Sequence, residues 1–403
     1  MRLAEPLTLP CGAVLRNRIL KSAMSEGLGT PAHAASAALP KLYERWARGG
    51  LGVAVTGNVM IDGRALGEPG NVVLEDDRHL EELRAWAQAG TTDGCDLWMQ
   101  LNHPGKQAPR FLNAETVSPS AVGFGKELSS AFPVPRALTE AEIEGLVARF
   151  GRAAGLAVQA GFTGVQIHGA HGYLVSQFLS PRHNVRTDRW GGSLENRARF
   201  VLAVYGAMRE AVGPSVPVSI KMNSADFQRG GFDEDDSLQV MTWLQDAGID
   251  LIEVSGGTYE APAMTGVKRS TREREGYFLD FVSRAKESLQ VPLCVTGGFR
   301  TPAGMEQALE EGAAMVGLAR ALCVQPELPR DVLAGKNVES KVRRLSTGIR
   351  AIDKTFPLDV LWYEVQLARM GEGDEPDPEL GEWHSLLTVL RRAGVQAFRM
   401  RRA

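Results

Sequence analysis

The sequence of 403 residues predicts an α/β protein: a single (β/α)8 barrel, or TIM barrel, with an N-terminal β-hairpin cap and a C-terminal helical tail. Two observations predict this fold. Short apolar runs alternate with amphipathic segments along most of the chain, and distinctive polar side chains follow the runs at their carboxyl ends. The rival is an open doubly wound sheet, but the GxGxxG turn that such a sheet uses after its first strand is absent from the sequence.

Eight short apolar runs are typical of buried β-strands. Each run is followed by a helix or by a connection that contains one, as parallel strands require. The predicted strands are 18–24, 52–57, 96–101, 164–168, 216–222, 251–256, 292–297 and 313–319.

The segment 139–160 gives the clearest helix signal. Thr139 and Glu142 have the spacing of a capping box, and apolar residues then recur at helical spacing. Pro302 after Thr301 marks a second helix start, because proline suits the first turn. The other predicted helices are 76–90, 195–212, 235–247, 276–289 and 302–311.

The two ends of the chain fall outside this alternation. Residues 7–18 predict a hairpin that caps the bottom of the barrel. The tail predicts helices at 360–370 and 379–395, separated by a polar turn. We therefore expect a barrel with its hairpin over residues 1–335 and a helical extension over 336–403.

The tail is too short for a separate domain, so it is expected to pack on the barrel or on a neighbouring subunit. Trp362 and Tyr363 are its most prominent side chains. They leave a homo-oligomer open, although burial within the chain is the simpler interpretation of two aromatic residues.

Composition excludes several classes of function. The net charge of −3 and the pI of about 6.2 give no basic surface for nucleic acid or an anionic membrane. The apolar runs are much shorter than a membrane span, and the N-terminus lacks the apolar segment of a signal peptide. Four scattered cysteines without a CxxC pair disfavour zinc, an iron–sulfur cluster and disulfides, and favour the reducing cytoplasm.

The most informative motif begins at the end of the predicted strand 164–168. His168 and His171 lie three residues apart, and Tyr173 follows. Two imidazoles can polarise a carbonyl and a phenol can deliver a proton, so the motif predicts an electrophilic catalytic site. Two other interpretations stay open. One is a pair of structural histidines; the other is a metal pair, which lacks a nearby carboxylate and the HExxH spacing.

Polar side chains also end the other predicted strands. Gln100 and Lys221 are hard to explain inside a barrel without a ligand, because burying an unpaired amide costs roughly 2–7 kcal/mol. After the last two strands, the Gly297-Gly298 turn and Arg320 predict a phosphate site. The alternative there is a plain tight turn beside a surface arginine.

On these residues the chain resembles the old yellow enzyme family of FMN-dependent oxidoreductases, and most of all its bacterial NADH:flavin oxidoreductase branch. The matching segments follow the family's order from about residue 3 to about residue 335, and the long fourth-strand motif is highly specific. The segments are NRILKSAM (17–24), VTGNVMIDGR (55–64), MQLNHPGKQA (99–108), IHGAHGYLVSQFLSPRHNVRTDRWGGSLENRARF (167–200), VTGGFRTP (295–302) and MVGLARAL (315–322).

The resemblance implies that FMN lies across the barrel mouth. Ala23, Met24 and Ser25 would line one side of the isoalloxazine, Asn58 and Gln100 would meet its pyrimidine edge, Lys221 would approach N1 and the C2 carbonyl, and Gly298, Phe299, Ala319 and Arg320 would hold the phosphate.

The resemblance also implies the catalytic roles. His168 and His171 would donate hydrogen bonds to the carbonyl of a small enone-type substrate, which would accept hydride from flavin N5. Tyr173 would protonate the α-carbon from the opposite face. NADH or NADPH would first reduce the flavin in the same pocket.

Three positions depart from the family pattern. Ser25 stands where threonine or cysteine is usual, Ala319 where glycine is usual, and Lys221 where arginine is commoner; a lysine lacks the bidentate fork. The chain also lacks the iron–sulfur cysteines and the second nucleotide-binding domain of longer, dienoyl-CoA reductase-like relatives, so electrons are expected directly from a nicotinamide.

Two other functions stay open at this point. A Schiff-base lyase would use Lys221 as its nucleophile and would need no flavin. A flavin-binding sensor would hold FMN without appreciable turnover.

Overall fold

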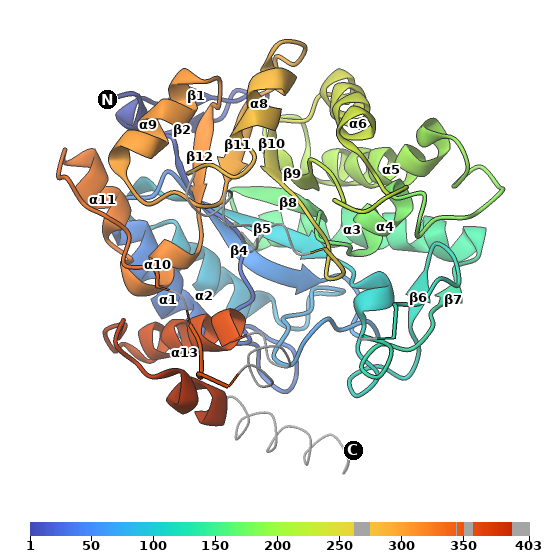
Figure 1. Ribbon diagram of the computed structural model, residues 1–403, viewed down its shortest axis with the longest axis horizontal. Helices are drawn as coiled ribbons and strands as arrows, with labels where there is room; N and C mark the ends of the chain where they lie inside the picture. Colours follow the sequence, from blue (N-terminus) through green and yellow to red (C-terminus); the bar gives the residue numbers. More distant parts are fainter. Residues whose placement is uncertain (127, 262–274, 344, 350–357, 389–403) are drawn as a thin grey trace.

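The computed structural model describes residues 1–126, 128–261, 275–343, 345–349 and 358–388 (Figure 1). Within these residues, eight parallel strands close into a barrel, which confirms the predicted fold. In barrel order the strands are β3 (Ile19–Lys21), β4 (Val53–Met60), β5 (Asp96–Asn102), β8 (Gly164–Gly169), β9 (Val218–Asn223), β10 (Leu251–Ser255), β11 (Leu293–Thr296) and β12 (Met315–Leu318).

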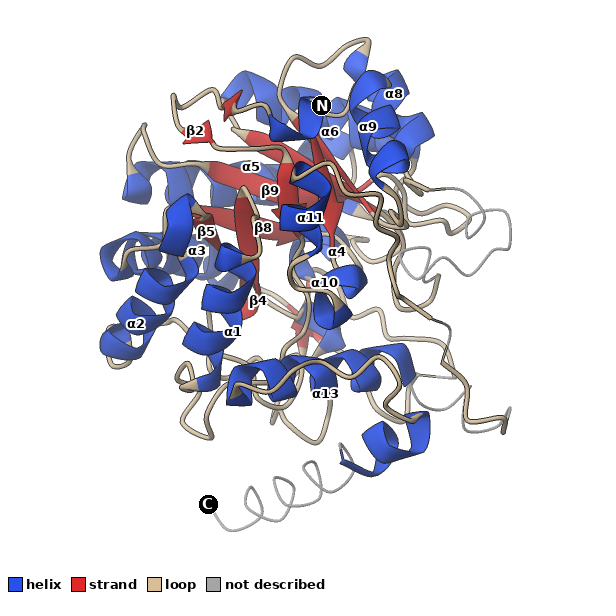
Figure 2. Cartoon of the chain, turned by 90° about the vertical axis from the view of Figure 1, so that its left-hand side faces the viewer, coloured by secondary structure: helices blue, strands red, loops and turns tan. Residues whose placement is uncertain are grey.

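The helices surround the strands on the outside (Figures 1 and 2). No helix in the described ranges has the length and apolar character needed to cross a membrane. The described α-helices are α1 (Ala38–Arg48), α2 (Leu80–Gly90), α3 (Glu140–Ala160), α4 (Leu174–Leu179), α5 (Leu194–Val212), α6 (Glu234–Ala247), α8 (Leu279–Lys286), α9 (Pro302–Glu310), α10 (Arg320–Val324), α11 (Leu328–Leu333) and α13 (Leu358–Glu372).

Helix α3 begins as its sequence predicts. The Thr139 hydroxyl accepts from the Glu142 N–H, and the Glu142 carboxylate accepts from the Thr139 N–H. Helix α1, in contrast, escaped the sequence analysis because its first residue follows Ala37, which offers no side-chain cap. Packing stabilises α1 instead: its Tyr43 and Trp46 are fully buried against the barrel.

The hairpin of β1 (Leu7–Thr8) and β2 (Val14–Leu15) closes the amino end of the barrel. Leu9 and Leu15 join an apolar cluster with residues of the barrel interior such as Leu20 and Trp98. The hairpin therefore leaves the carboxyl ends of the strands as the open face. A second short pair, β6 (Val117–Ser118) and β7 (Arg136–Ala137), lies on the long connection after β5.

In the tail, α13 packs against α1 and α10 (Figure 2). Trp362 and Tyr363 are buried within the chain, and the Trp362 indole donates to the Leu380 carbonyl at 2.7 Å. Of the second predicted tail helix, residues 382–388 are helical and 389–395 lie outside the described residues. The division of the chain at residue 335 stays a prediction.

A substitution of Gly317 in β12 would test how tightly side chains fill the barrel interior. A Cβ added there would lie 2.0 Å from Thr296 Oγ1 and 2.7 Å from Ser22 Oγ. We expect Gly317→Ala to lower the free energy of unfolding by about 1–3 kcal/mol, because a close-packed interior resists overpacking. The matched control is Gly145→Ala on the exposed face of α3, where nothing lies within 4 Å. There alanine should stabilise the helix by up to about 1 kcal/mol in urea unfolding; equal effects at both sites would contradict the account.

Candidate active site

The structure brings His168, His171 and Tyr173 together at the carboxyl end of β8. The two imidazole centroids are 5.5 Å apart, and the His168 ring lies 4.5 Å from the Tyr173 ring. His168 is buried within β8, whereas His171 adopts a left-handed backbone with φ of 60°. This conformation turns the chain back over the barrel mouth, so three side chains close in sequence share one site.

Neighbouring strands hold the two histidines in place. The His171 backbone N–H donates to Asn223 Oδ1 at 3.1 Å, and its Nε2 lies 2.7 Å from Ser255 Oγ. His168 Nδ1 accepts from the Ala170 N–H at 3.4 Å, which leaves Nε2 as the donor of that ring. Hydrogen bonds from three different strand ends therefore fix how the imidazoles point.

The same environment keeps both imidazoles neutral. Burial lowers the pKa of His168 and of His171 well below the usual 6.5, and the nearby charge of Lys221 lowers both further. A neutral imidazole carries one N–H donor and one acceptor at physiological pH. The pair can therefore donate hydrogen bonds to a carbonyl without bringing a positive charge into the mouth.

Beneath the histidines, a layer of polar side chains crosses the barrel interior. Gln100 donates to Gln166 at 2.8 Å, and Gln166 donates to Glu253 at 3.0 Å. Glu253 also accepts from the Thr296 hydroxyl at 2.8 Å and forms an ion pair with Lys221 at 3.1 Å. Gln100 and Lys221, the two buried polar residues that the sequence left without partners, thus belong to one hydrogen-bonded layer.

The sequence analysis missed two residues of this layer, Gln166 and Glu253, and Glu253 is the one that carries a charge. Burial alone would raise the pKa of its carboxyl, but Lys221, Ser22 and Thr296 more than offset that effect and lower it. The carboxylate is therefore charged opposite Lys221. A signal was present, because a glutamate inside the apolar run 251–256 is as unusual as the lysine it faces.

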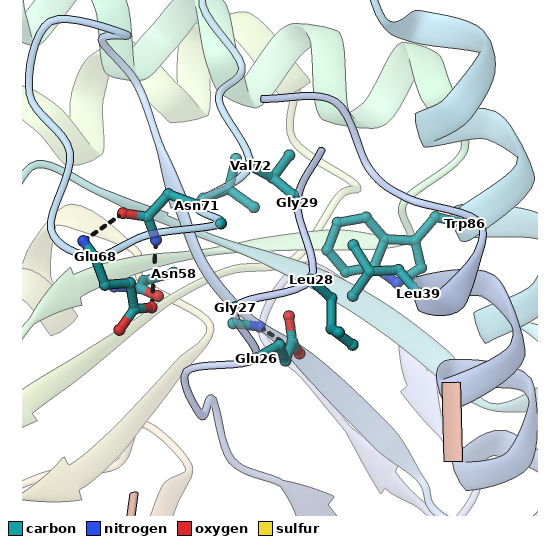
Figure 3. A pocket seen from close by; sticks show the side chains of 13 residues that line it. Glu26, Gly27, Leu28, Gly29, Leu39, Asn58, Glu68, Asn71, Val72 and Trp86 are labelled. Carbon is teal, nitrogen blue, oxygen red and sulfur yellow. Dashed lines mark hydrogen bonds between the residues drawn. The ribbon is translucent and has the colours of Figure 1, made fainter. Parts of the chain in front are cut away.

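A small cavity lies beside this layer, next to Asn58 (Figure 3). Glu26, Glu68 and Asn71 line it too, and its volume of about 10 Å³ is close to what one water molecule needs. Asn71 donates to Glu68 at 3.3 Å. Burial, together with the charge of Glu26, raises the pKa of Glu68 to about 7, although hydrogen bonds from Ser25 and Asn71 oppose the shift. Ser25 thus contacts a carboxyl that the sequence did not point to.

The remaining predicted residues end β3, β11 and β12. Ala23 packs against the interior cluster, and the Met24 sulfur lies 3.5 Å from the Cys323 sulfur. Phe299 is buried, and Ala319 and Arg320 are half-buried. These residues lie around the same mouth as the histidines, on its opposite side in barrel order.

Three features of the mouth fit a phosphate-bearing polar ligand such as FMN. Both Gly297 and Gly298 have positive φ angles, and the N–H groups of Gly298 and Phe299 donate to no acceptor among the described residues. Arg320 has no carboxylate partner within the described ranges. Asn102, at the end of β5, is 1% exposed, and neither polar atom of its side chain has a described partner. Such donors suit an anion and a polar ring.

Comparison with known proteins agrees with this site. The NADH-dependent flavin oxidoreductase iliE of Hypocrea jecorina (strain QM6a) is 38% identical over 361 residues, which cover 83% of this chain and 89% of that protein. A solved 2-naphthoyl-CoA reductase, in complex with 2-naphthoyl-CoA, has a TM-score of 0.78 at 26% identity, over 84% of this chain and 54% of that one. An old yellow enzyme homologue from Zymomonas mobilis has a TM-score of 0.72 at 23% identity, over 85% and 95% of the two chains, and shows the same fold.

Fold and site together define a barrel oxidoreductase with a cluster of hydrogen-bonding side chains at the strands' carboxyl ends. The model of the NADH:flavin oxidoreductase / NADH oxidase family matches residues 2–339, and the chain belongs to this family. It is therefore an FMN-dependent oxidoreductase that takes electrons from NADH or NADPH and acts on small molecules. The resemblance seen in the sequence is confirmed; the individual roles of the site residues are taken up below.

The ion pair of Lys221 and Glu253 makes a stability prediction. Glu253→Gln should lower the free energy of unfolding by about 3–5 kcal/mol, because it leaves Lys221 buried without its partner. The control is the double variant Lys221→Met/Glu253→Gln, which removes both charges and should recover much of the loss. Urea unfolding of the three proteins decides; a double variant less stable than Glu253→Gln would contradict this account.

The buried histidines predict a loss of stability in acid. Burial lowers the pKa of His103 to about 4 and that of His183 to about 3, and shifts His168 and His171 in the same direction. Below pH 6.5 the unfolded imidazoles take up protons and the folded ones do not, so stability is full above pH 6.5 and falls toward pH 4. Each histidine contributes about 1.4 kcal/mol per pH unit in that window.

The measurement is urea unfolding at pH 7.5 and at pH 5.5. The matched variant is His183→Gln, whose amide oxygen can still accept from Lys106, the present donor to His183 Nδ1 at 3.1 Å. Its loss between the two pH values should be smaller than that of the native protein by about 1.4 kcal/mol. Glu68 has a raised pKa, which changes stability in the opposite direction. Its effect is the same in both proteins, so the difference between their losses of unfolding free energy reports His183 alone. Equal losses in the two proteins would rule out a neutral buried His183.

Proposed function

We propose that the protein is an ene-reductase that reduces the activated C=C bond of α,β-unsaturated carbonyl compounds. One observation carries the proposal: two neutral imidazole donors and a protonated phenol meet at the barrel mouth. Hydrogen bonds from His168 and His171 to a substrate carbonyl would draw electron density from the conjugated double bond. The β-carbon of the substrate then becomes the better hydride acceptor.

Tyr173 supplies the proton in this proposal. Burial raises the pKa of its phenol well above 10, and Tyr259 and Glu68 raise it further. The phenol therefore stays protonated at physiological pH, and transfers its proton only to a strongly basic carbon such as the α-carbon after hydride addition. The Tyr173 ring lies 4.5 Å from the His168 ring, so the proposed proton donor and the histidine that would polarise the carbonyl can contact one substrate.

FMN, when bound, supplies the hydride that the nicotinamide delivered. In this proposal Gly298, Phe299 and Arg320 would hold its phosphate, and Asn102, Gln100 and Lys221 would hold its ring system. Lys221 would act there as one half of a neutral ion pair with Glu253, and not as a lone cation.

A row of aromatic rings that extends from Tyr173 favours a flat conjugated substrate. Tyr259 lies 6.0 Å from Tyr173, Phe132 lies 6.3 Å from Tyr259, and Phe124 lies 5.1 Å from Phe132, all between ring centroids. Aromatic rings in this arrangement pack well against a planar molecule. Similarity to a 2-naphthoyl-CoA reductase supports the same preference.

The two rival functions fit less well. A Schiff-base lyase needs a free lysine nucleophile, whereas the Lys221 amine is engaged in an ion pair with Glu253. A sensor needs no proton donor, so the position of Tyr173 would be unexplained. We place the enzyme in the cytoplasm as part of this proposal, because Cys11, Cys95, Cys294 and Cys323 are free thiols.

The test is anaerobic stopped-flow absorbance of the holoenzyme, first with NADH or NADPH and then with cyclohexenone. The flavin band should bleach with the nicotinamide and return with the enone. Tyr173→Phe should leave the bleaching rate unchanged and slow the return by about 10²–10⁴-fold, the usual contribution of a general acid. Equal slowing of both steps would remove Tyr173 as proton donor, and a native flavin that the enone never reoxidises would contradict the proposed function.

A further inference from the structure

The hydroxyl of Tyr173 lies 2.9 Å from the hydroxyl of Tyr259. The two side chains differ in exposure: Tyr173 is 7% exposed, and Tyr259 is 42% exposed. Tyr259 comes from the connection that follows β10, two strands away from β8 around the barrel. A buried phenol is thus linked by one hydrogen bond to a phenol at the surface of the mouth.

The backbone on the N-terminal side of Tyr259 is fixed to the turn that carries Tyr173. Thr258 and His171 form a parallel β-bridge, and Gln228 donates to the Thr258 hydroxyl at 2.9 Å. Asn223 completes the connection, since it accepts from the His171 N–H and donates to the Gly257 carbonyl at 2.9 Å. The Tyr173–Tyr259 contact is therefore held by the backbone of both connections.

The C-terminal side of Tyr259 is anchored through charge. Glu260 forms an ion pair with Lys106 at 3.5 Å. Lys106 is 1% exposed, lies 4.0 Å from the Phe124 ring centroid, and its Nζ is 3.1 Å from His183 Nδ1. A buried ammonium requires partners of this kind, so Glu260 is pinned, and Tyr259 is held between two anchored neighbours.

Both phenols retain their protons at physiological pH. Loss of hydration around its hydroxyl, which faces Tyr173, raises the pKa of Tyr259 to about 12, and burial raises the pKa of Tyr173 well above 10. A neutral hydroxyl can donate one hydrogen bond and accept others at the same time. Tyr259 can therefore donate to the Tyr173 oxygen while it accepts from water on its exposed side.

We propose that Tyr259 is a positioning residue that relays a proton from solvent to Tyr173. This inference rests on the proposed function. As Tyr173 gives its proton to the substrate α-carbon, an O–H bond breaks and a C–H bond forms. The Tyr259 proton moves to the Tyr173 oxygen, and water returns a proton to the Tyr259 oxygen. Each turnover thus draws one proton from solvent, and no buried phenolate is left behind.

The relay solves a physical problem of the site. A phenolate at Tyr173 would be a buried charge in a site where both neighbouring imidazoles are neutral. Leaving such a charge without a donor is costly. In the described part of the chain, the Tyr259 hydroxyl is the hydrogen-bond partner recorded for the Tyr173 hydroxyl.

Tyr259→Phe in the holoenzyme tests the relay, because it removes one oxygen and keeps the ring. Reduction of the flavin by NADH should be unchanged. Reoxidation by cyclohexenone should slow about tenfold, the rate equivalent of one hydrogen bond. The control is Tyr205→Phe on the outer helix α5, which should alter neither step. Measured in mixtures of H₂O and D₂O, native reoxidation should depend on deuterium content as more than one coupled proton transfer, and Tyr259→Phe as one.

A second readout needs no turnover. Tyr173→Phe and Tyr259→Phe each remove the same hydrogen bond, so the drop in Tm of the double variant should be smaller than the sum of the two single drops. Fully additive drops would overturn the contact on which the relay rests. The Phe variants keep the packing of both rings, so all three proteins are expected to fold.

The possible failures are distinguishable. If Tyr173→Phe slows reoxidation and Tyr259→Phe does not, the relay is wrong and the proposed function stands. If Tyr259→Phe slows flavin reduction and reoxidation equally, Tyr259 has a structural role only, and the relay is again wrong. If the native enzyme does not reduce cyclohexenone or any other enone, the proposed function itself fails.

Discussion

The ion pair between Lys221 and Glu253 is the interaction on which the active site depends. Two opposite charges 3.1 Å apart occupy the centre of a closed barrel, where neither could stay charged alone. Gln166 and Thr296 satisfy the remaining carboxylate lone pairs, and Gln100 extends the layer to β5. The layer thus connects strands on several sides of the barrel and forms a rigid polar floor under the mouth.

This floor sets the electrostatics above it. The Lys221 ammonium lies near both His168 and His171 and, with burial, keeps them from taking up a proton. Because the Glu253 carboxylate balances the charge of Lys221, the site combines two neutral imidazole donors with an ion pair that has no net charge. In the proposed reaction, hydride transfer to a neutral enone builds negative charge on the substrate oxygen, and preorganised donors stabilise that charge without changing their own. The arrangement therefore favours the transition state over the resting substrate.

The sequence predicted the barrel and most of its strands because periodicity and chain order are local properties. It placed His168, His171 and Tyr173 in one site because they are neighbours along the chain. It missed the partners that arrive from other strands: Glu253 opposite Lys221, and Tyr259 opposite Tyr173. Each of these contacts exists only after the barrel closes, and a lone tyrosine in a connection carries no pattern of its own. Helix α1 was missed for a related reason, since burial of Trp46 stabilises it and no capping residue marks it.

The two phenols show why such long-range contacts matter for chemistry. A general acid must be shielded from water to keep a high pKa, yet it must recover its proton after every turnover. One residue cannot satisfy both demands, because shielding and access to solvent oppose each other. In the proposed relay, these demands are divided between a buried Tyr173 and a more exposed Tyr259, which a single hydrogen bond connects. The β-bridge from Thr258 to His171 then ties that bond to the same turn that positions the substrate donors, so that polarisation and protonation share one rigid frame.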